Sequence, residues 1–298
     1  MVKKCCPATM NSSQSFQEVL NQNKGLNYYL KKDKKTCCPP IINLLDHEVW
    51  RRENGYWFGE YTFLNGNGLV NYNVNASNDS GEFNYRKYYG FIYLKVEGNT
   101  LKQRNIFVRP PLDLEKIDKN SDGTVTVEEF DVHGFTSSYP VTINTNTNIA
   151  SGKYRDRSGN EIVKNFNYTQ GTEKKFEANQ TATDNSGNLS GPYYIAPGFS
   201  VPTTTKIMGN NTVVYQVGDG RGGISQNQLT TLPGDNTRIR TAQGIGFSKY
   251  ASYYRETKFQ DICGGQTAKQ QFIAKLQEIR QLSNVPDSSK IDLSWFDI

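Results

Sequence analysis

Residues 118–129 bring together oxygen-bearing side chains at a spacing that suits a hard divalent cation. Three of them alternate along the chain, and a glycine and a glutamate follow: Asp118, Asn120, Asp122, Gly123 and Glu129. Calcium is held by about six to eight oxygens, mostly from carboxylates, carbonyls and water. The glycine permits the sharp reversal that turns a chain around an ion. The segment therefore predicts a binding site for calcium, the expected cofactor.

The same segment resembles the calcium-binding loop of EF-hand proteins at each diagnostic position. The resemblance implies a backbone carbonyl ligand from Thr124, a direct or water-mediated ligand from Thr126, and a bidentate carboxylate from Glu129. The ligand set that the resemblance implies is Asp118, Asn120, Asp122, Thr124, Thr126 and Glu129.

The flanks of this loop depart from the EF-hand pattern. Pro110-Pro111 leaves little chain for an entering helix, and Gly134 ends the exiting helix soon after Phe130. Val125 stands where the family forms a short β-bridge to a second loop, and the sequence contains no second loop. Because paired loops open a hydrophobic groove in calcium sensors, we expect a structural clamp rather than a signalling switch.

Catalytic motifs are lacking in the sequence. The two histidines, His47 and His133, have neither H-x-x-H nor H-E-x-x-H neighbours, and no P-loop, Rossmann or G-x-S-x-G motif occurs. Paired carboxylates from distant loops stay open as an alternative. We expect a protein without enzymatic activity.

Most of the chain favours a mainly β fold. It contains 18 Tyr and 15 Phe, with turn residues between short β-rich runs. Since no helices separate these runs, the pattern predicts an antiparallel barrel or sandwich. The expected strands lie in 56–63, 83–89, 90–96, 101–108, 141–143, 161–168, 174–178, 193–195, 212–217, 238–241 and 250–259.

Helices are expected towards both ends of the chain. Apolar spacing predicts them at 13–35, 41–52 and 266–282, and the last has an apolar face made of Phe272, Ile273, Leu276, Ile279 and Leu282. The apolar tail 293–298 either folds back onto the β domain or docks a partner. Two polar segments, 179–190 and 218–223, are expected to be surface loops.

The first expected strand opens with Gly55-Tyr56-Trp57 after a short helix. This arrangement resembles the Gly-x-Trp start of lipocalin and other calycin barrels, and cyanobacterial barrels related to bilin lyases begin in a similar way. In lipocalins an arginine late in the barrel packs across the tryptophan, and Arg255 is the candidate here. The resemblance implies a ligand site that includes Trp57, Tyr61 and Arg255.

Positive charge is concentrated in residues 1–40, which hold seven lysines against Glu18 and Asp33. The remainder of the chain is balanced, so no nucleic-acid specificity is expected. The arm also carries Cys5-Cys6 and Cys37-Cys38, which permit four alternatives: a zinc site, a cross-link, acylation that gives membrane contact, or free thiols. We expect no secretory signal or membrane span, and an intracellular or intracellularly assembled location.

Two functions of different classes fit these features. The first is a calcium-stabilised structural or assembly protein that docks through its termini to protein partners in a larger complex, such as a virus particle. The second is a lipocalin-like carrier of an apolar or pigment ligand. The expected organisation is a basic arm (1–40), a β domain (41–262), and a C-terminal helix with an apolar tail (263–298).

Overall fold

The computed structural model describes residues 42–64, 88–111, 119–130, 138–155, 161–167, 169–196, 198–218, 222–244, 251–288 and 290–298. Apart from Ile42, these residues belong to one unit, Asn43–Ile298. The basic arm, the helix expected at 13–35 and the two cysteine pairs lie outside the described residues.

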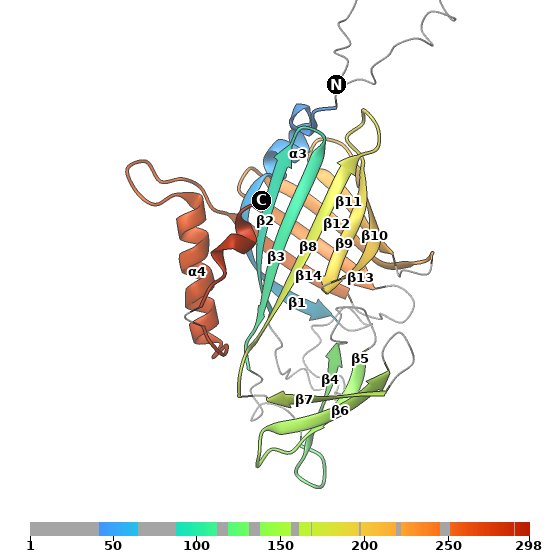
Figure 1. Ribbon diagram of the computed structural model, residues 1–298, viewed down its shortest axis with the longest axis vertical. Helices are drawn as coiled ribbons and strands as arrows, with labels where there is room; N and C mark the ends of the chain where they lie inside the picture. Colours follow the sequence, from blue (N-terminus) through green and yellow to red (C-terminus); the bar gives the residue numbers. More distant parts are fainter. Residues whose placement is uncertain are drawn as a thin grey trace, which may run out of the picture. The chain divides into compact units, whose positions relative to one another are not determined.

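Ten strands close into an antiparallel barrel in the order β1-β14-β13-β12-β11-β10-β9-β8-β3-β2 (Figure 1). The strands are β1 (Gly55–Leu64), β2 (Tyr88–Glu97), β3 (Thr100–Arg109), β8 (Thr172–Ala182), β9 (Leu189–Ala196), β10 (Phe199–Ile207), β11 (Thr212–Gly218), β12 (Ile224–Gly234), β13 (Thr237–Gly244) and β14 (Ala251–Lys258). β1 pairs with both β2 and β14, so the sheet closes without a free edge. The predicted mainly β, antiparallel fold is confirmed in its barrel form.

One end of the barrel is covered by η1 (Leu44–Asp46) and α3 (Glu48–Glu53), where a helix was expected. Trp50 of α3 is fully buried, and its indole Nε1 donates to the Gly187 carbonyl at 2.9 Å. The Leu44 amide donates to the Gly98 carbonyl at 2.7 Å. These bonds attach the short helices to the β2–β3 and β8–β9 turns, so they seal this end of the barrel.

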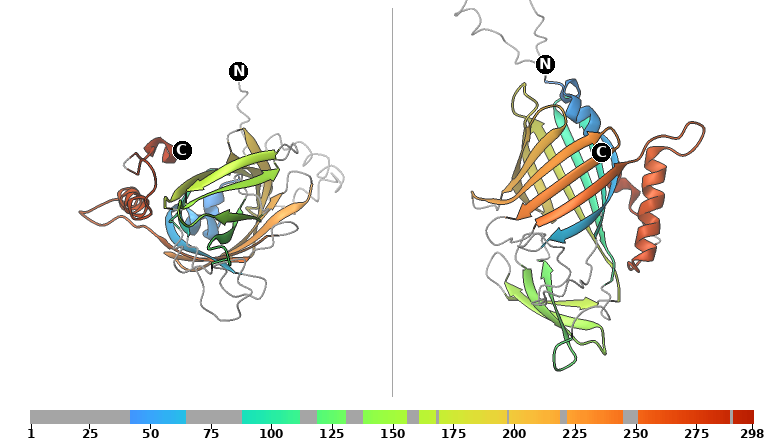
Figure 2. Two further views of the ribbon diagram at one scale, coloured as in Figure 1. Left: turned by 90° about the horizontal axis from the view of Figure 1, so that it is seen from below. Right: turned by 180° about the vertical axis from the view of Figure 1, so that it is seen from behind.

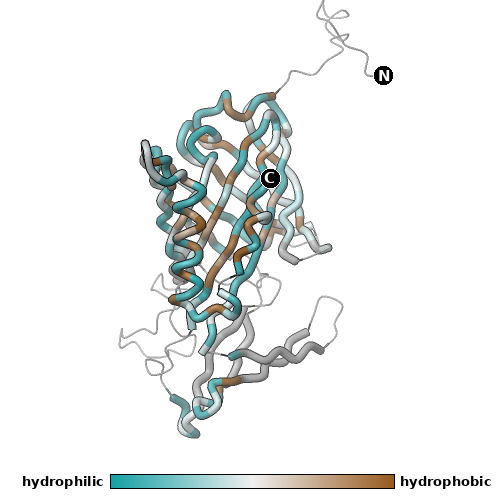
Figure 3. Tube along the Cα trace, turned by 60° about the vertical axis from the view of Figure 1, so that its left-hand side comes forward, coloured by the Kyte–Doolittle hydropathy of each residue, from teal (hydrophilic) through white to brown (hydrophobic). Residues whose placement is uncertain are grey.

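A C-terminal helix, α4 (Ala268–Leu282), covers part of the outer wall beside β1 and β2 (Figure 2). Thr267 and Gln270 form a capping box at its start, which satisfies two otherwise unpaired amides. Its buried residues Phe272, Leu276 and Ile279 pack with strand residues of the wall in one hydrophobic cluster. The alternation of hydrophobic and hydrophilic positions along α4 is visible in Figure 3. The helix is confirmed, but Leu282 is 74% exposed and does not belong to its buried face.

The apolar tail folds back onto the β domain, which resolves the alternative left open by the sequence. It forms η3 (Leu293–Phe296), and Phe296 is buried against Phe272 with ring centroids 5.0 Å apart. Trp295 lies beside the cationic groups of Arg104 and Lys175, at 5.5 and 5.3 Å from its ring. The tail therefore completes the outer cluster around α4.

The segment between β3 and β8 forms two hairpins. They are β4 (Val125–Phe130) with β5 (Ser138–Ile143), and β6 (Ile149–Arg155) with β7 (Glu161–Asn167). The exiting helix expected from the EF-hand resemblance is absent at 125–130, because β4 takes its place. Val125 has a partner after all, since it pairs with Ile143 of β5.

The polar segment 179–190 is not a long loop. Asn179 to Ala182 belong to β8 and Leu189 begins β9, so only a short turn remains between them. Its polar residues occur in the wall because Gln180 faces the inside of the barrel, where it bonds to Thr205. The other expected loop, 218–223, is only partly described.

Candidate ligand-binding site inside the barrel

Trp57 lies at the sealed end of the barrel, near the start of β1. Its side chain is fully buried, and its indole Nε1 donates to the Glu53 carbonyl at 2.7 Å. The guanidinium of Arg238, on β13, lies over the ring with its central carbon 4.5 Å from the ring centroid. Arg238, and not the expected Arg255, is therefore the arginine that packs across the Trp57 ring.

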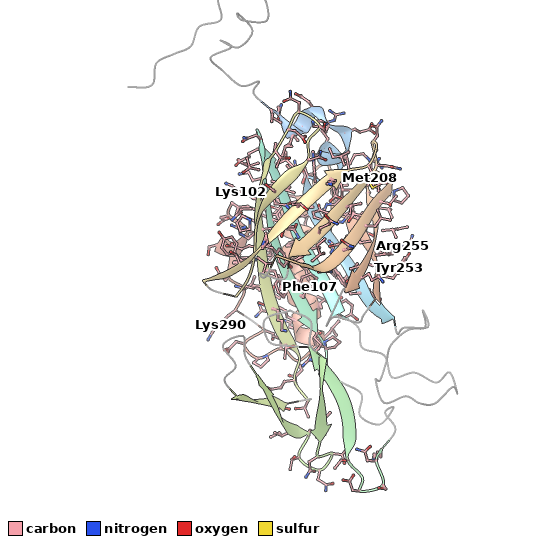
Figure 4. The ribbon with its side chains drawn as sticks, turned by 90° about the vertical axis from the view of Figure 1, so that its right-hand side faces the viewer. Lys102, Phe107, Met208, Tyr253, Arg255 and Lys290 are labelled. Carbon is pink, nitrogen blue, oxygen red and sulfur yellow. The ribbon has the colours of Figure 1, made fainter. Side chains whose placement is uncertain are left out.

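The reason for this correction is the alternation of side chains on β14. Tyr254 and Glu256 are buried inside the barrel, so Arg255 between them must point outwards. Figure 4 shows Arg255 and Tyr253 on the outer face. Arg238 is the arginine that faces inwards, but the strand register was needed to identify it.

Arg238 is held between two carboxylates that the sequence did not single out. Its Nη1 donates to Glu53 of α3, and its Nε donates to Glu256 of β14. Burial alone would raise the pKa of Glu256, but Arg238 and Arg240 outweigh it and hold this pKa below its ordinary value. The arrangement links α3, β13 and β14, and so fixes the sealed end.

Tyr61 lies further along the inside of β1, in a space that two glycines provide. Gly59 pairs with Gly90 of β2 and with Glu256 of β14. A Cβ on Gly90 would lie 1.9 Å from the Tyr61 ring, so only glycine fits under this ring. The Tyr61 hydroxyl donates to Glu256 Oε1 at 2.7 Å, and burial together with this carboxylate raises the Tyr61 pKa.

Arg240 continues the row of charged residues deeper into the barrel. It lies 6.0 Å from the Tyr61 ring centroid and 5.3 Å from that of Tyr254. Gln228, on β12, satisfies its hydrogen bonding when its amide oxygen is turned towards Arg240, where it accepts from Nε and, at 2.7 Å, from Nη2. Glu256 Oε1 lies 3.5 Å from Arg240 Nη1.

Aromatic rings extend from Tyr61 across the inside of the wall, from β3 to β8 and β9. Phe107 meets Tyr61 edge-on at 5.1 Å, Phe176 meets Phe107 at 5.4 Å, and Tyr193 stacks on Phe176 at 5.9 Å. Phe107, Phe176 and Tyr193 keep accessible surface, whereas inward residues near α3 such as Trp57 and Leu101 are fully buried.

Polar side chains lie between these rings on the inner wall. Gln180 and Thr205 bond to each other at 3.0 Å. Thr203 and Thr230 are 4% and 0% exposed, and within the described part of the chain their hydroxyls have no hydrogen-bond partner. A buried hydroxyl without a partner costs free energy, so these two groups suit a polar atom of a bound molecule or an ordered water.

The predicted calcium ligands are only partly described. Asp118 lies outside the described residues. Asn120, Asp122 and Thr124 meet in one turn, where the Thr124 hydroxyl lies 2.6 Å from Asp122 Oδ1 and 2.8 Å from Asn120 Nδ2. Hydrogen bonds from Thr124 lower the pKa of Asp122.

The last two predicted ligands, Thr126 and Glu129, belong to β4. Glu129 is five residues beyond Thr124, which is about 16 Å along an extended strand at ~3.3 Å per residue. An extended strand therefore does not return Glu129 to the turn as a helix would. Among the described residues, no group of three or more His, Cys, Asp or Glu is placed to hold a metal ion.

Comparison with known proteins assigns no family to the chain. No protein-family model and no curated protein matches the chain. Among solved structures it is similar to the crystal structure of a protein with unknown function from the DUF3598 family, from Nostoc punctiforme. The identity is 11%, the TM-score is 0.19, and the alignment covers 70% of this chain and 97% of that one. At this TM-score the likeness supports no argument. Across the described residues, no helix has the length and apolarity of a membrane span.

Proposed function

We propose that this protein is a carrier that holds a small molecule inside its barrel. One observation carries the proposal: inward-facing residues deep in the wall keep accessible surface. Burial raises the pKa of both Tyr193 and Tyr215, yet neither side chain is fully covered. Surface that remains accessible on inward side chains is surface that a ligand can cover.

The size of the barrel supports the same proposal. Barrel diameter grows with strand number, and about eight strands already leave room for one small ligand. This barrel has ten strands. Since α3 seals one end, a ligand would enter from the other and reach Phe107, Phe176 and Tyr193, which keep accessible surface. Aromatic walls with a few polar groups are typical of small-molecule sites.

The test is to isolate the full chain from its native source and from a heterologous host, extract it with organic solvent, and analyse the extract by absorption and mass spectrometry. We expect a stoichiometric compound from the native source. The inward substitution Thr203→Phe should abolish its retention, and Thr204→Phe, at an exposed neighbouring position, should preserve it. Equal retention by both variants would place the compound outside the barrel and contradict the proposal.

A second candidate function is calcium binding by the turn at 118–124. The meeting of the Asp122 carboxylate and the Thr124 hydroxyl in one turn, with Asn120 beside them, favours it. Asp118 would complete the set, and Glu129 would not be required. Calcium should then raise the melting temperature, and Asp118→Ala with Asp122→Ala should remove the increase. Asp235→Ala, an exposed acid in the β12–β13 turn, is the matched control.

The assembly role expected from the sequence stays a prediction. It relied on two docking segments, the basic arm and the apolar tail. The arm lies outside the described residues, and the tail packs on the barrel through Phe296. We therefore place the carrier function first.

A further inference from the structure

Arg240 is a buried cation inside the barrel that shares its carboxylate partner with other residues. Its side chain faces the interior and is 8% exposed. Glu256 forms an ion pair with it at 3.5 Å, and both oxygens of this carboxylate are already used. Oε2 accepts from Arg238, and Oε1 accepts from Tyr61 at 2.7 Å.

The hydrogen-bonding capacity of Arg240 is also incompletely used. A guanidinium carries more N–H donors than Gln228 and Glu256 can accept from it. A buried charge is favourable only when it is paired and hydrogen-bonded. Arg238 has two carboxylate partners, Glu53 and Glu256, although its Nη2 has no hydrogen-bond partner among the described residues. The two arginines are therefore suited to different tasks.

Thr230 lies directly across from Arg240 in the β12–β13 register. Its hydroxyl is buried and has no partner among the described residues. A hydroxyl beside a guanidinium forms a pair of donors that can reach the two oxygens of one carboxylate. The rings of Tyr61 and Tyr254 border the same guanidinium.

We propose that the ligand is an amphipathic molecule with an anionic oxygen group, such as a carboxylate, and that Arg240, with Gln228 and Thr230, binds this group. The apolar part of the ligand lies against the aromatic rings that extend from Tyr61 to Tyr193. The inference rests on the proposed carrier function and adds the chemical class of the ligand.

The experiment compares two fluorescent probes that differ only in charge: dansyl-aminoundecanoic acid and its methyl ester. Each is titrated into the delipidated full-length protein, and the increase in dansyl emission gives the dissociation constant. Charge-assisted hydrogen bonds should make the acid bind about 10- to 100-fold more tightly than the ester.

Three variants locate the effect. Arg240→Gln should abolish the preference for the acid. Arg255→Gln removes the same charge from the outer face and should keep the preference. Gln228→Glu supplies a carboxylate beside Arg240 from within the protein, so it should also abolish the preference; because it adds an ion pair, it tests the inference even if Arg240→Gln fails to fold.

The outcomes separate the inference from the proposed function. Equal binding of acid and ester would overturn the assignment of an anionic group and leave the carrier function standing. Failure of both probes to bind would count against both. An acid preference that survives in folded Gln228→Glu protein would show that another cation receives the anion, and would overturn the role of Arg240.

Discussion

The two halves of the barrel interior differ in how their arginines are paired with carboxylates. Near α3, Arg238 is enclosed by Glu53 and Glu256, and Trp57 covers it. Further along, Arg240 has incomplete pairing, and the hydroxyls of Thr203 and Thr230 find no partner in the part of the chain that is described. The contrast is one of charge: Arg238 has two carboxylate partners, whereas Arg240 shares Glu256 with Arg238 and Tyr61.

The largest loss of stability should come from removing the charge of Arg238 near α3. Arg238→Met removes the ion-pair partner of the buried Glu53 and leaves Glu256 with the more distant Arg240, and removing one partner of a buried ion pair costs about 3–5 kcal/mol. Urea unfolding followed by circular dichroism measures the loss. Arg255→Met, the exposed control, should stay within about 0.5 kcal/mol of the parent. Equal losses in the two variants would show that the network does not stabilise the sealed end.

A smaller loss of stability is expected from adding a methyl group beneath the Tyr61 ring. Gly90→Ala places a methyl group 1.9 Å from the ring as it now lies, and such overpacking costs about 1–3 kcal/mol. Gly234→Ala, where the added Cβ meets open space, should be nearly neutral. Adding Tyr61→Leu to Gly90→Ala should recover part of the loss, and strict additivity would disprove the proposed clash.

Replacing each of three inward threonines by valine makes the same chemical change at a paired hydroxyl and at two unpaired ones. Thr205→Val breaks the bond to Gln180 and should lower the free energy of unfolding by about 1–2 kcal/mol. Thr203→Val and Thr230→Val remove hydroxyls that lack partners, so the ligand-free protein should gain stability or remain unchanged. Thermal unfolding of delipidated protein provides the measurement. Losses of similar size at all three sites would indicate that ordered water satisfies the last two hydroxyls.

The smallest expected effect is a dependence of the free energy of unfolding on pH in the acidic range. Because the folded pKa of Glu256 lies below its ordinary value of 4.5, its ionisation favours the folded state above that pH. This stabilisation is lost as the pH falls through the lowered pKa. Urea midpoints measured from pH 6 down to pH 3 should therefore fall more steeply for the parent than for Glu256→Gln. Parallel curves would contradict this assignment.

The sequence predicted the β fold better than it predicted which residues line the inside of the barrel. Aromatic runs around Tyr56 and Phe91 revealed their strands because strongly β-forming residues are clustered there. β10 and β12 were not predicted, since Pro202 and the polar run at 225–231 are typical of loops. Those polar residues occur in strands because several of them line a polar interior.

The residues of the candidate site were likewise predicted only in part. Trp57 and Tyr61 were predicted as ligand-site residues and do lie inside the barrel, near Arg238 and Arg240. The arginines, both on β13, were missed because their carboxylate partners come from other elements, and only the register brings Arg238 opposite Glu256. The calcium loop was predicted from local spacing alone, and local spacing could not reveal that a strand follows it.

Closure between β1 and β14 has a consequence for biosynthesis. The Tyr61–Glu256 bond joins residues 195 positions apart, so the last seam of the wall forms only after nearly all of the strands have left the ribosome. Until then, β1 exposes an unpaired edge with aromatic residues on it. Contacts between such distant segments form slowly, and nascent chains with open edges are prone to aggregate. We expect the maturation of this protein to depend on chaperones that shield β1 during translation.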